Sequence, residues 1–240
     1  MTFQIFQIIN NIKVLVLWKK MLSFRKFLNE NTGTTRTTVK PKNKIELMKI
    51  IKDTIKREGN NCDLNFIDTS AITDMTELFR GSKFNGDISE WDVSNVTHMT
   101  EMFRESKFNG NISKWDVSNV RFMVNMFRES IFDKDISKWD TSKVRSMERM
   151  FQYSDFNGDV SRWNVSNVVN MKLMFSDSPF NKDISRWDVS NVEDMEQMFA
   201  YSKFNQDISE WNTSKVKNTF WMFKKSPLEG NEPEWYKEIN

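Results

Sequence analysis

The stretch Phe84–Lys107, FNGDISEWDVSNVTHMTEMFRESK, is one copy of a 24-residue unit that recurs along most of the chain. Its tryptophan, Trp91, returns every 24 residues as far as Trp211, and positions of phenylalanine and methionine return in the same register. A fixed period of this length is typical of proteins built from stacked structural repeats. Because these large apolar residues recur at fixed positions, we expect them to form a continuous core.

The middle of the unit predicts a short strand. Ile88-x-x-Trp91-x-Val93-x-x-Val96 follows the spacing of leucine-rich repeats, which places Trp91 and Val93 inward and Asp92 outward. Strands of successive units are then expected to stack in parallel, about 4.8 Å apart.

The second half of the unit predicts a helix. Val96, Met99, Met102 and Phe103 fall on one helical face, and Ser94 precedes them as the expected N-cap. The Asn-Gly pair that follows Phe108 is expected to turn the chain back with a positive φ. The fold class predicted is therefore an α/β repeat, a leucine-rich-repeat-like solenoid of short parallel strands and helices.

Four regions follow from this pattern. They are a leader and flexible linker over 1–43, a helical N-terminal cap over 44–63, tandem repeats over 64–223 and a C-terminal cap over 224–240. The helix is expected over Lys44–Arg57, where apolar residues recur at helical spacing. Trp235 is the expected plug at the C-terminal end. The segment Phe3–Trp18 is interpreted either as an amphipathic helix that associates weakly with a membrane or as residues upstream of a true start at Met21.

Composition excludes most catalytic chemistry. The chain has one cysteine, Cys62, and one histidine, His98, so it offers no disulfide, no cysteine or histidine metal cluster and no supported catalytic triad. Residues 1–60 carry 13 basic and 4 acidic side chains, whereas the remainder carries 22 and 29. An acidic array is a poor ligand for phosphate backbones, so we expect no nucleic-acid binding, no cofactor, no metal and no enzyme activity.

Acidic and amide residues recur before Ser89 and its equivalents. Their oxygens suit either calcium or the capping of turns by hydrogen bonds from the backbone. Capping is the favoured interpretation, because the glycine-rich calcium repeat is missing. The residues are Asp87, Asn111, Asp135, Asp159, Asp183 and Asp207.

The outward face of the predicted strands is the expected binding surface for a protein partner. Its charges vary in sign along the array, with basic residues in the central units flanked by acidic ones. This pattern could complement a patterned partner, although an ordinary solvated face has the same composition. The candidate residues are Glu90, Asp92, Lys114, Asp116, Lys138, Asp140, Arg162, Asn164, Arg186, Asp188, Glu210 and Asn212.

The run FNxDISxWDVSNVxxMxxMF resembles the repeat of BspA-type leucine-rich-repeat proteins, which include bacterial surface lipoproteins and adhesins. The resemblance covers about Val39–Phe223. It implies a non-enzymatic protein–protein interaction or adhesion module and exposure at a surface. The alternative is a structural or decoy repeat without a specific ligand. The sequence shows no clear export signal, which favours the cytoplasm.

Overall fold

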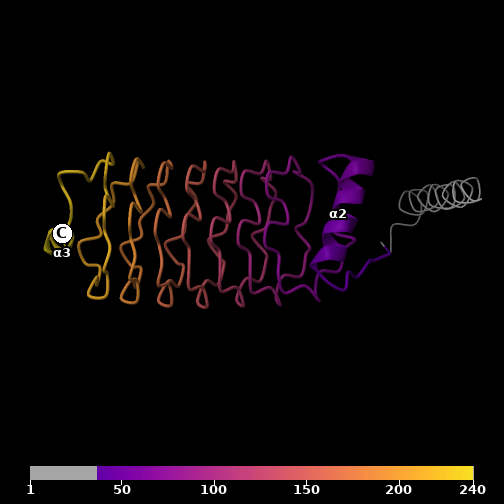
Figure 1. Cartoon of the computed structure of the whole chain (residues 1–240), viewed down its shortest axis with the longest axis horizontal. Coiled ribbons are helices and arrows are strands. Elements are labelled where there is room, and N and C mark those ends of the chain that lie inside the picture. Colours follow the sequence, from indigo (N-terminus) through magenta and orange to yellow (C-terminus); the bar gives the residue numbers. More distant parts are fainter. Residues whose placement is uncertain (1–36, 240) are drawn as a thin grey trace, which may run out of the picture. The chain divides into compact units, whose positions relative to one another are not determined.

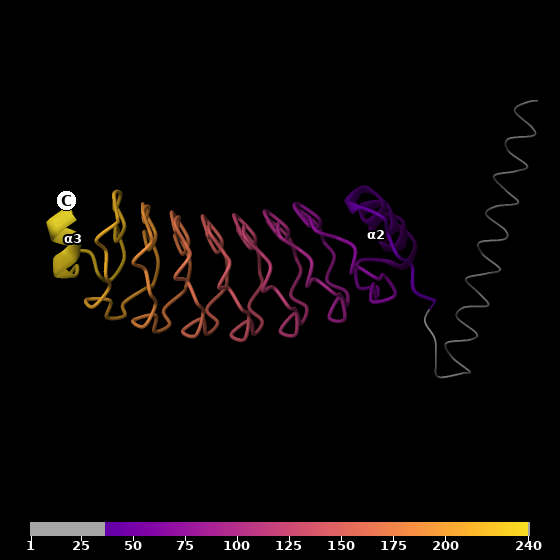
Figure 2. The same cartoon turned by 90° about the horizontal axis from the view of Figure 1, so that it is seen from below.

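The computed structural model describes residues 37–239, and residues 39–239 belong to one compact unit. The predicted segment Phe3–Trp18 and most of the leader over 1–43 lie outside the described residues. Helix α2 (Lys44–Glu58) stands at one end of a stack of coils, and helix α3 (Glu234–Ile239) stands at the other (Figure 1). Between the helices, each 24-residue unit makes one coil, and the coils lie side by side in both views (Figures 1 and 2).

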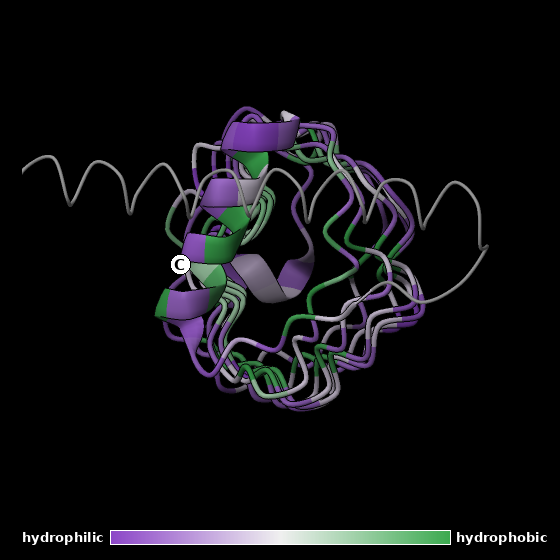
Figure 3. Cartoon of the chain, turned by 90° about the vertical axis from the view of Figure 1, so that its right-hand side faces the viewer, coloured by the Kyte–Doolittle hydropathy of each residue, from purple (hydrophilic) through white to green (hydrophobic). Residues whose placement is uncertain are grey.

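The predicted leucine-rich-repeat solenoid of strands and helices is wrong. Within residues 37–239, α2 and α3 are the only helices, and parallel pairing is confined to isolated bridges such as Asp74↔His98 and His98↔Phe122. Each coil instead consists of tight turns joined by short extended segments. Viewed down the stack, successive coils overlie one another (Figure 3).

Tight turns closed by a backbone hydrogen bond across three residues form each coil. Apart from Glu101–Arg104, which overlaps two of the others, four turns are distinguished by their buried first and last residues. In the coil that contains Trp91, these four turns are Ile88–Trp91, Val93–Val96, Met99–Met102 and Phe103–Ser106, with N···O distances of 2.9 to 3.2 Å. We call them turns A, B, C and D. Their first and last residues are all buried, so the turns direct side chains inward at every corner of the coil.

Turns C and D explain why the sequence predicted a helix here. Glu101 and Glu105, each the third residue of its turn, have φ values of 55° and 57°, which no right-handed helix contains. Two successive turns place Met99, Met102, Phe103 and Ser106 inward at spacings of three, one and three residues, which is also the spacing of a helical face. Apolar periodicity alone therefore cannot separate the two structures.

Two smaller predictions fail for related reasons. Ser94 is no helix N-cap, because it lies inside turn B and its N–H donates to Asp92 Oδ1 at 3.0 Å. The positive φ expected at the Asn-Gly pair is also missing, because Gly110 does not have a positive φ. A Cβ on Gly110 would lie 2.7 Å from the ring of Phe108, so glycine is needed there for close approach.

The core is a set of parallel aromatic columns. Phe103 stacks on Phe127 with ring centroids 5.5 Å apart and planes 6° apart, and this arrangement repeats along the array. The recurring Trp, Phe and Met positions are buried, which confirms the predicted core. In the tryptophan column from Trp91 to Trp235, each Nε1 also donates to a carbonyl oxygen 27 residues earlier, as Trp163 does to Ile136 at 3.0 Å.

The two ends of the stack are covered in different ways. The helix expected over Lys44–Arg57 is present as α2, and it buries Leu47 and Ile51 against the first coil. At the other end, Trp235 lies 24 residues after Trp211 and continues the tryptophan column from within α3. Its Nε1 donates to Ile208 O at 2.9 Å, and its ring stacks on Trp211 with centroids 6.3 Å apart.

Candidate functional site

The twelve residues of the predicted binding surface are all exposed, but they lie on the corners of the coils rather than on a strand face. Glu90 and its equivalents lie within turn A. Asp92 and its equivalents precede turn B, and each accepts a hydrogen bond from the backbone N–H two residues on, at 2.9 to 3.2 Å. Half of the predicted surface therefore stabilises the turns of its own coil.

The polar residues before turn A act in the same way. Asp135 Oδ1 accepts from Ser137 N at 2.9 Å, and Asn111 makes the same bond to Ser113 at 3.0 Å. The backbone hydrogen bond from Ser137 holds the pKa of Asp135 below its usual value. These bonds confirm the capping interpretation. In the described part of the chain, no three His, Cys, Asp or Glu side chains are arranged to hold a metal ion.

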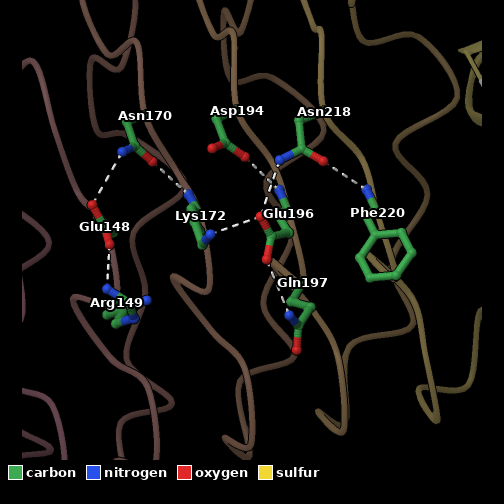
Figure 4. A network of polar contacts seen from close by, with 9 residues as sticks. All are labelled: Glu148, Arg149, Asn170, Lys172, Asp194, Glu196, Gln197, Asn218 and Phe220. Carbon is green, nitrogen blue, oxygen red and sulfur yellow. Dashed lines mark hydrogen bonds and ion pairs between the residues drawn. The ribbon is translucent and has the colours of Figure 1, made fainter.

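A third position caps turn C. His98 belongs to a column whose members differ in type, and its carboxylate and amide members bond to the backbone two residues on. Asn170, Asp194 and Asn218 accept from the N–H groups of Lys172, Glu196 and Phe220 at 2.9 to 3.1 Å (Figure 4). His98 itself is exposed, as predicted, and its ring stacks on Phe122 at 5.1 Å.

The charged side chains beside this third column neutralise one another. Lys172 Nζ lies 2.7 Å from Glu196 Oε2, which also accepts from Asn218 at 3.0 Å (Figure 4). The hydrogen bond from Lys172 lowers the pKa of Glu196. Glu148 pairs with Arg149 and accepts from Asn170. Because its ionic groups are already paired, this face offers little unsatisfied charge to a ligand.

A groove with the opposite property follows the end of turn B across several coils. It has a volume of about 480 Å³. We call it the basic groove, and it is lined by Arg121, Lys143, Arg145, Asn167, Val169, Asn191, Glu193 and Lys215. Four cations and one anion face it, although residues 61–240 as a whole carry 22 basic and 29 acidic side chains.

Arg121 and Arg145 occupy equivalent positions in adjacent coils. Arg145 N donates to Arg121 O at 2.9 Å, so the two Cα atoms are held at about the 4.8 Å spacing of paired strands. Both side chains are exposed, and neither makes an ion pair or side-chain hydrogen bond with any residue in 37–239. Like charges at this separation repel each other, which costs stability in the absence of a counter-ion.

The rest of the groove is preorganised by amides. Asn119 Oδ1 accepts from Lys143 Nζ at 2.7 Å, and Asn191 Oδ1 accepts from Lys215 Nζ at 2.6 Å. These bonds fix the direction of both ammonium groups without neutralising them. The one acid, Glu193, is paired with Lys217 at 2.7 Å. The groove therefore presents net positive charge along the axis of the stack.

The arginines near turns C and D show the contrasting arrangement. Arg80 and Arg104 both reach Glu101, at 2.9 and 3.2 Å, and Arg128 reaches Glu129 at 2.9 Å. Guanidinium groups of this array are thus paired where a carboxylate stands beside them. The basic groove was not predicted from the sequence, although arginine recurs at the same position of two adjacent units.

These features define a class of protein, a tandem-repeat stack whose outward columns carry its polar chemistry. The chain belongs to the family described as "Mycoplasma protein of unknown function, DUF285", which matches residues 47–155 and 129–235. The two matches overlap and together extend from α2 to Trp235. Comparison with curated proteins and with solved structures gives no significant match. None of the helices described here is long and apolar enough to cross a membrane.

Proposed function

We propose that this protein is a non-enzymatic binding module that holds an extended, acidic segment of a protein partner in the basic groove. The observation that carries the proposal is the pair Arg121 and Arg145, which stand side by side without a counter-ion at a groove. A partner carboxylate would remove their mutual repulsion and form charge-assisted hydrogen bonds with them. The resemblance of the repeat to BspA-type adhesins also supports a partner-binding role.

The dimensions of the groove suit a short extended peptide. From the coil of Arg121 to that of Lys215, the groove crosses four intervals of about 4.8 Å, or about 19 Å, which is the length of about six extended residues. Acidic residues would occupy the end beside Arg121 and Arg145. The exposed side chain of Val169, with 41% of its surface accessible, offers an apolar contact in the middle.

The test is binding of fluorescein-labelled six-residue peptides to the full chain, followed by fluorescence anisotropy. The peptides carry two glutamates at one end, at the other end or at neither end. We expect the doubly acidic peptides to bind, and the variant R121E/R145E to weaken their binding at least about tenfold, since hydrogen bonds to charged groups contribute about 1.5–3 kcal/mol.

The matched control is R162E/R186E, which makes the same change of charge at two exposed residues of turn A. It should bind as the unmodified chain does. Equal loss in both variants would show that only overall charge matters. No binding of any acidic peptide would instead favour the alternative, a structural or decoy repeat without a specific ligand.

A further inference from the structure

The cationic end of the basic groove contains three groups rather than two. Lys143 lies two residues before Arg145 in the same coil and also lines the groove, and its ammonium group donates to Asn119 Oδ1 at 2.7 Å. Arg121 enters from the preceding coil, next to Arg145. Two planar guanidinium groups and one ammonium group therefore line the groove from two adjacent coils, and all three side chains are exposed.

This set of donors exceeds what one carboxylate can accept. A carboxylate has two oxygens, and one guanidinium fork already satisfies both in a bidentate pair. A phosphate monoester has three terminal oxygens and a charge of about −1.5 to −2 at pH 7. It can therefore accept from both forks and from the ammonium group at once, and it compensates most of the local charge.

The surroundings favour the same ligand. The acid that lines the groove, Glu193, belongs to a coil two units beyond Arg145 and is paired with Lys217. Repulsion between Glu193 and a dianion bound at Arg121 and Arg145 is therefore weak, because distance and the neighbouring lysine both reduce it.

We infer that Arg121, Lys143 and Arg145 form a subsite for a phosphorylated serine or threonine of the partner segment. This inference rests on the proposed function, because the subsite is one end of the same groove. Beyond the proposed function, the inference states that phosphorylation of the partner segment strengthens the binding of that segment to the groove. Recognition of the dianion depends on the forked geometry of the arginines as well as on their charge.

The experiment compares four labelled peptides that differ at one residue. That residue is serine, glutamate, phosphoserine or sulfotyrosine. Anisotropy titrations with the full chain should give the tightest binding for phosphoserine, at least about tenfold tighter than for glutamate. Sulfotyrosine has three terminal oxygens but a single negative charge, so it should bind more tightly than glutamate and less tightly than phosphoserine. Inorganic phosphate should compete with the phosphoserine peptide more effectively than chloride at equal ionic strength.

The variant R145K keeps the charge but loses the fork. We expect it to reduce the preference for phosphoserine over glutamate to less than about threefold while the glutamate peptide still binds. Circular dichroism would show that the fold of the variant is intact. Binding of the glutamate peptide without any preference for phosphoserine would overturn this inference and leave the proposed function standing. Absence of binding by all four peptides would overturn both.

Discussion

Removal of one indole N–H from the middle of the stack should cost more than removal of the same group from its end. In the variant W163F, the bond from Trp163 Nε1 to Ile136 O is lost. That carbonyl keeps its turn bond from Trp139 N at 3.2 Å, so the loss is about 1 kcal/mol rather than the full penalty of an unsatisfied group. The smaller ring leaves a void of about 40 Å³, which costs about another 1 kcal/mol.

The expected total for W163F is therefore about 2 kcal/mol in the free energy of unfolding. Trp235 makes the equivalent bond to Ile208, but it packs against a coil on one side only. Because each coil of a repeat array contacts only its neighbours, W235F should cost about 1 kcal/mol and loosen the C-terminal end.

Urea unfolding followed by circular dichroism measures both variants, and hydrogen exchange shows which coils open. Equal destabilisation by W163F and W235F would refute the idea that the tryptophan column acts through neighbouring coils. A loss below about 0.5 kcal/mol in W163F would refute the contribution of the indole bond itself.

Two further predictions concern the opening coil. G86A should lower the free energy of unfolding by more than about 2 kcal/mol in a thermal melt, because the new Cβ would lie 1.9 Å from the backbone oxygen of Cys62. G158A makes the same change in a later coil, where the new Cβ meets only the ring of Phe156, and it should cost less. Asp68 has its pKa lowered to about 2 by hydrogen bonds from Ser70 and Lys40. Its stabilising contribution is therefore complete above about pH 4 and is lost as the pH falls toward 2. In a plot of the free energy of unfolding against pH, D68N should therefore reduce the loss of stability between about pH 4 and pH 2. An unchanged loss would contradict this prediction.

The sequence predicted the period, the core and the first helix because these depend on side-chain type. Trp91 and Phe103 recur at fixed intervals and are buried, and the apolar face of Lys44–Arg57 has helical spacing. The local conformation could not be predicted in the same way. Glu101 and Glu105 adopt positive φ although neither is a residue that favours it, so their identity carried no sign of the turns that replaced the predicted helix.

The candidate site escaped prediction because it depends on how neighbouring columns face each other. Lys143 and Arg145 are two residues apart, whereas Arg121 is one full unit earlier, and only the stacking of coils brings the three together. The predicted surface around Asp92 is exposed as expected. The sequence did not show, however, that the carboxylate of Asp92 accepts a hydrogen bond from the backbone of turn B.

Some recurring positions need a particular side chain to hold the coils together, whereas others do not. This difference favours the basic groove as the surface that determines which ligand is bound. Asn109 uses its side chain to accept from the backbone N–H of the next coil at 3.1 Å, so replacing it by an apolar residue costs a bond between coils. Arg121 and Arg145 are linked through their backbones alone, and Val169 and Glu193 continue the same row with bonds of 2.9 and 2.8 Å. Every residue type except proline, which has no backbone N–H, satisfies that pairing. The residues along this row can therefore change charge and shape without disturbing the stack, which leaves them free to match a ligand.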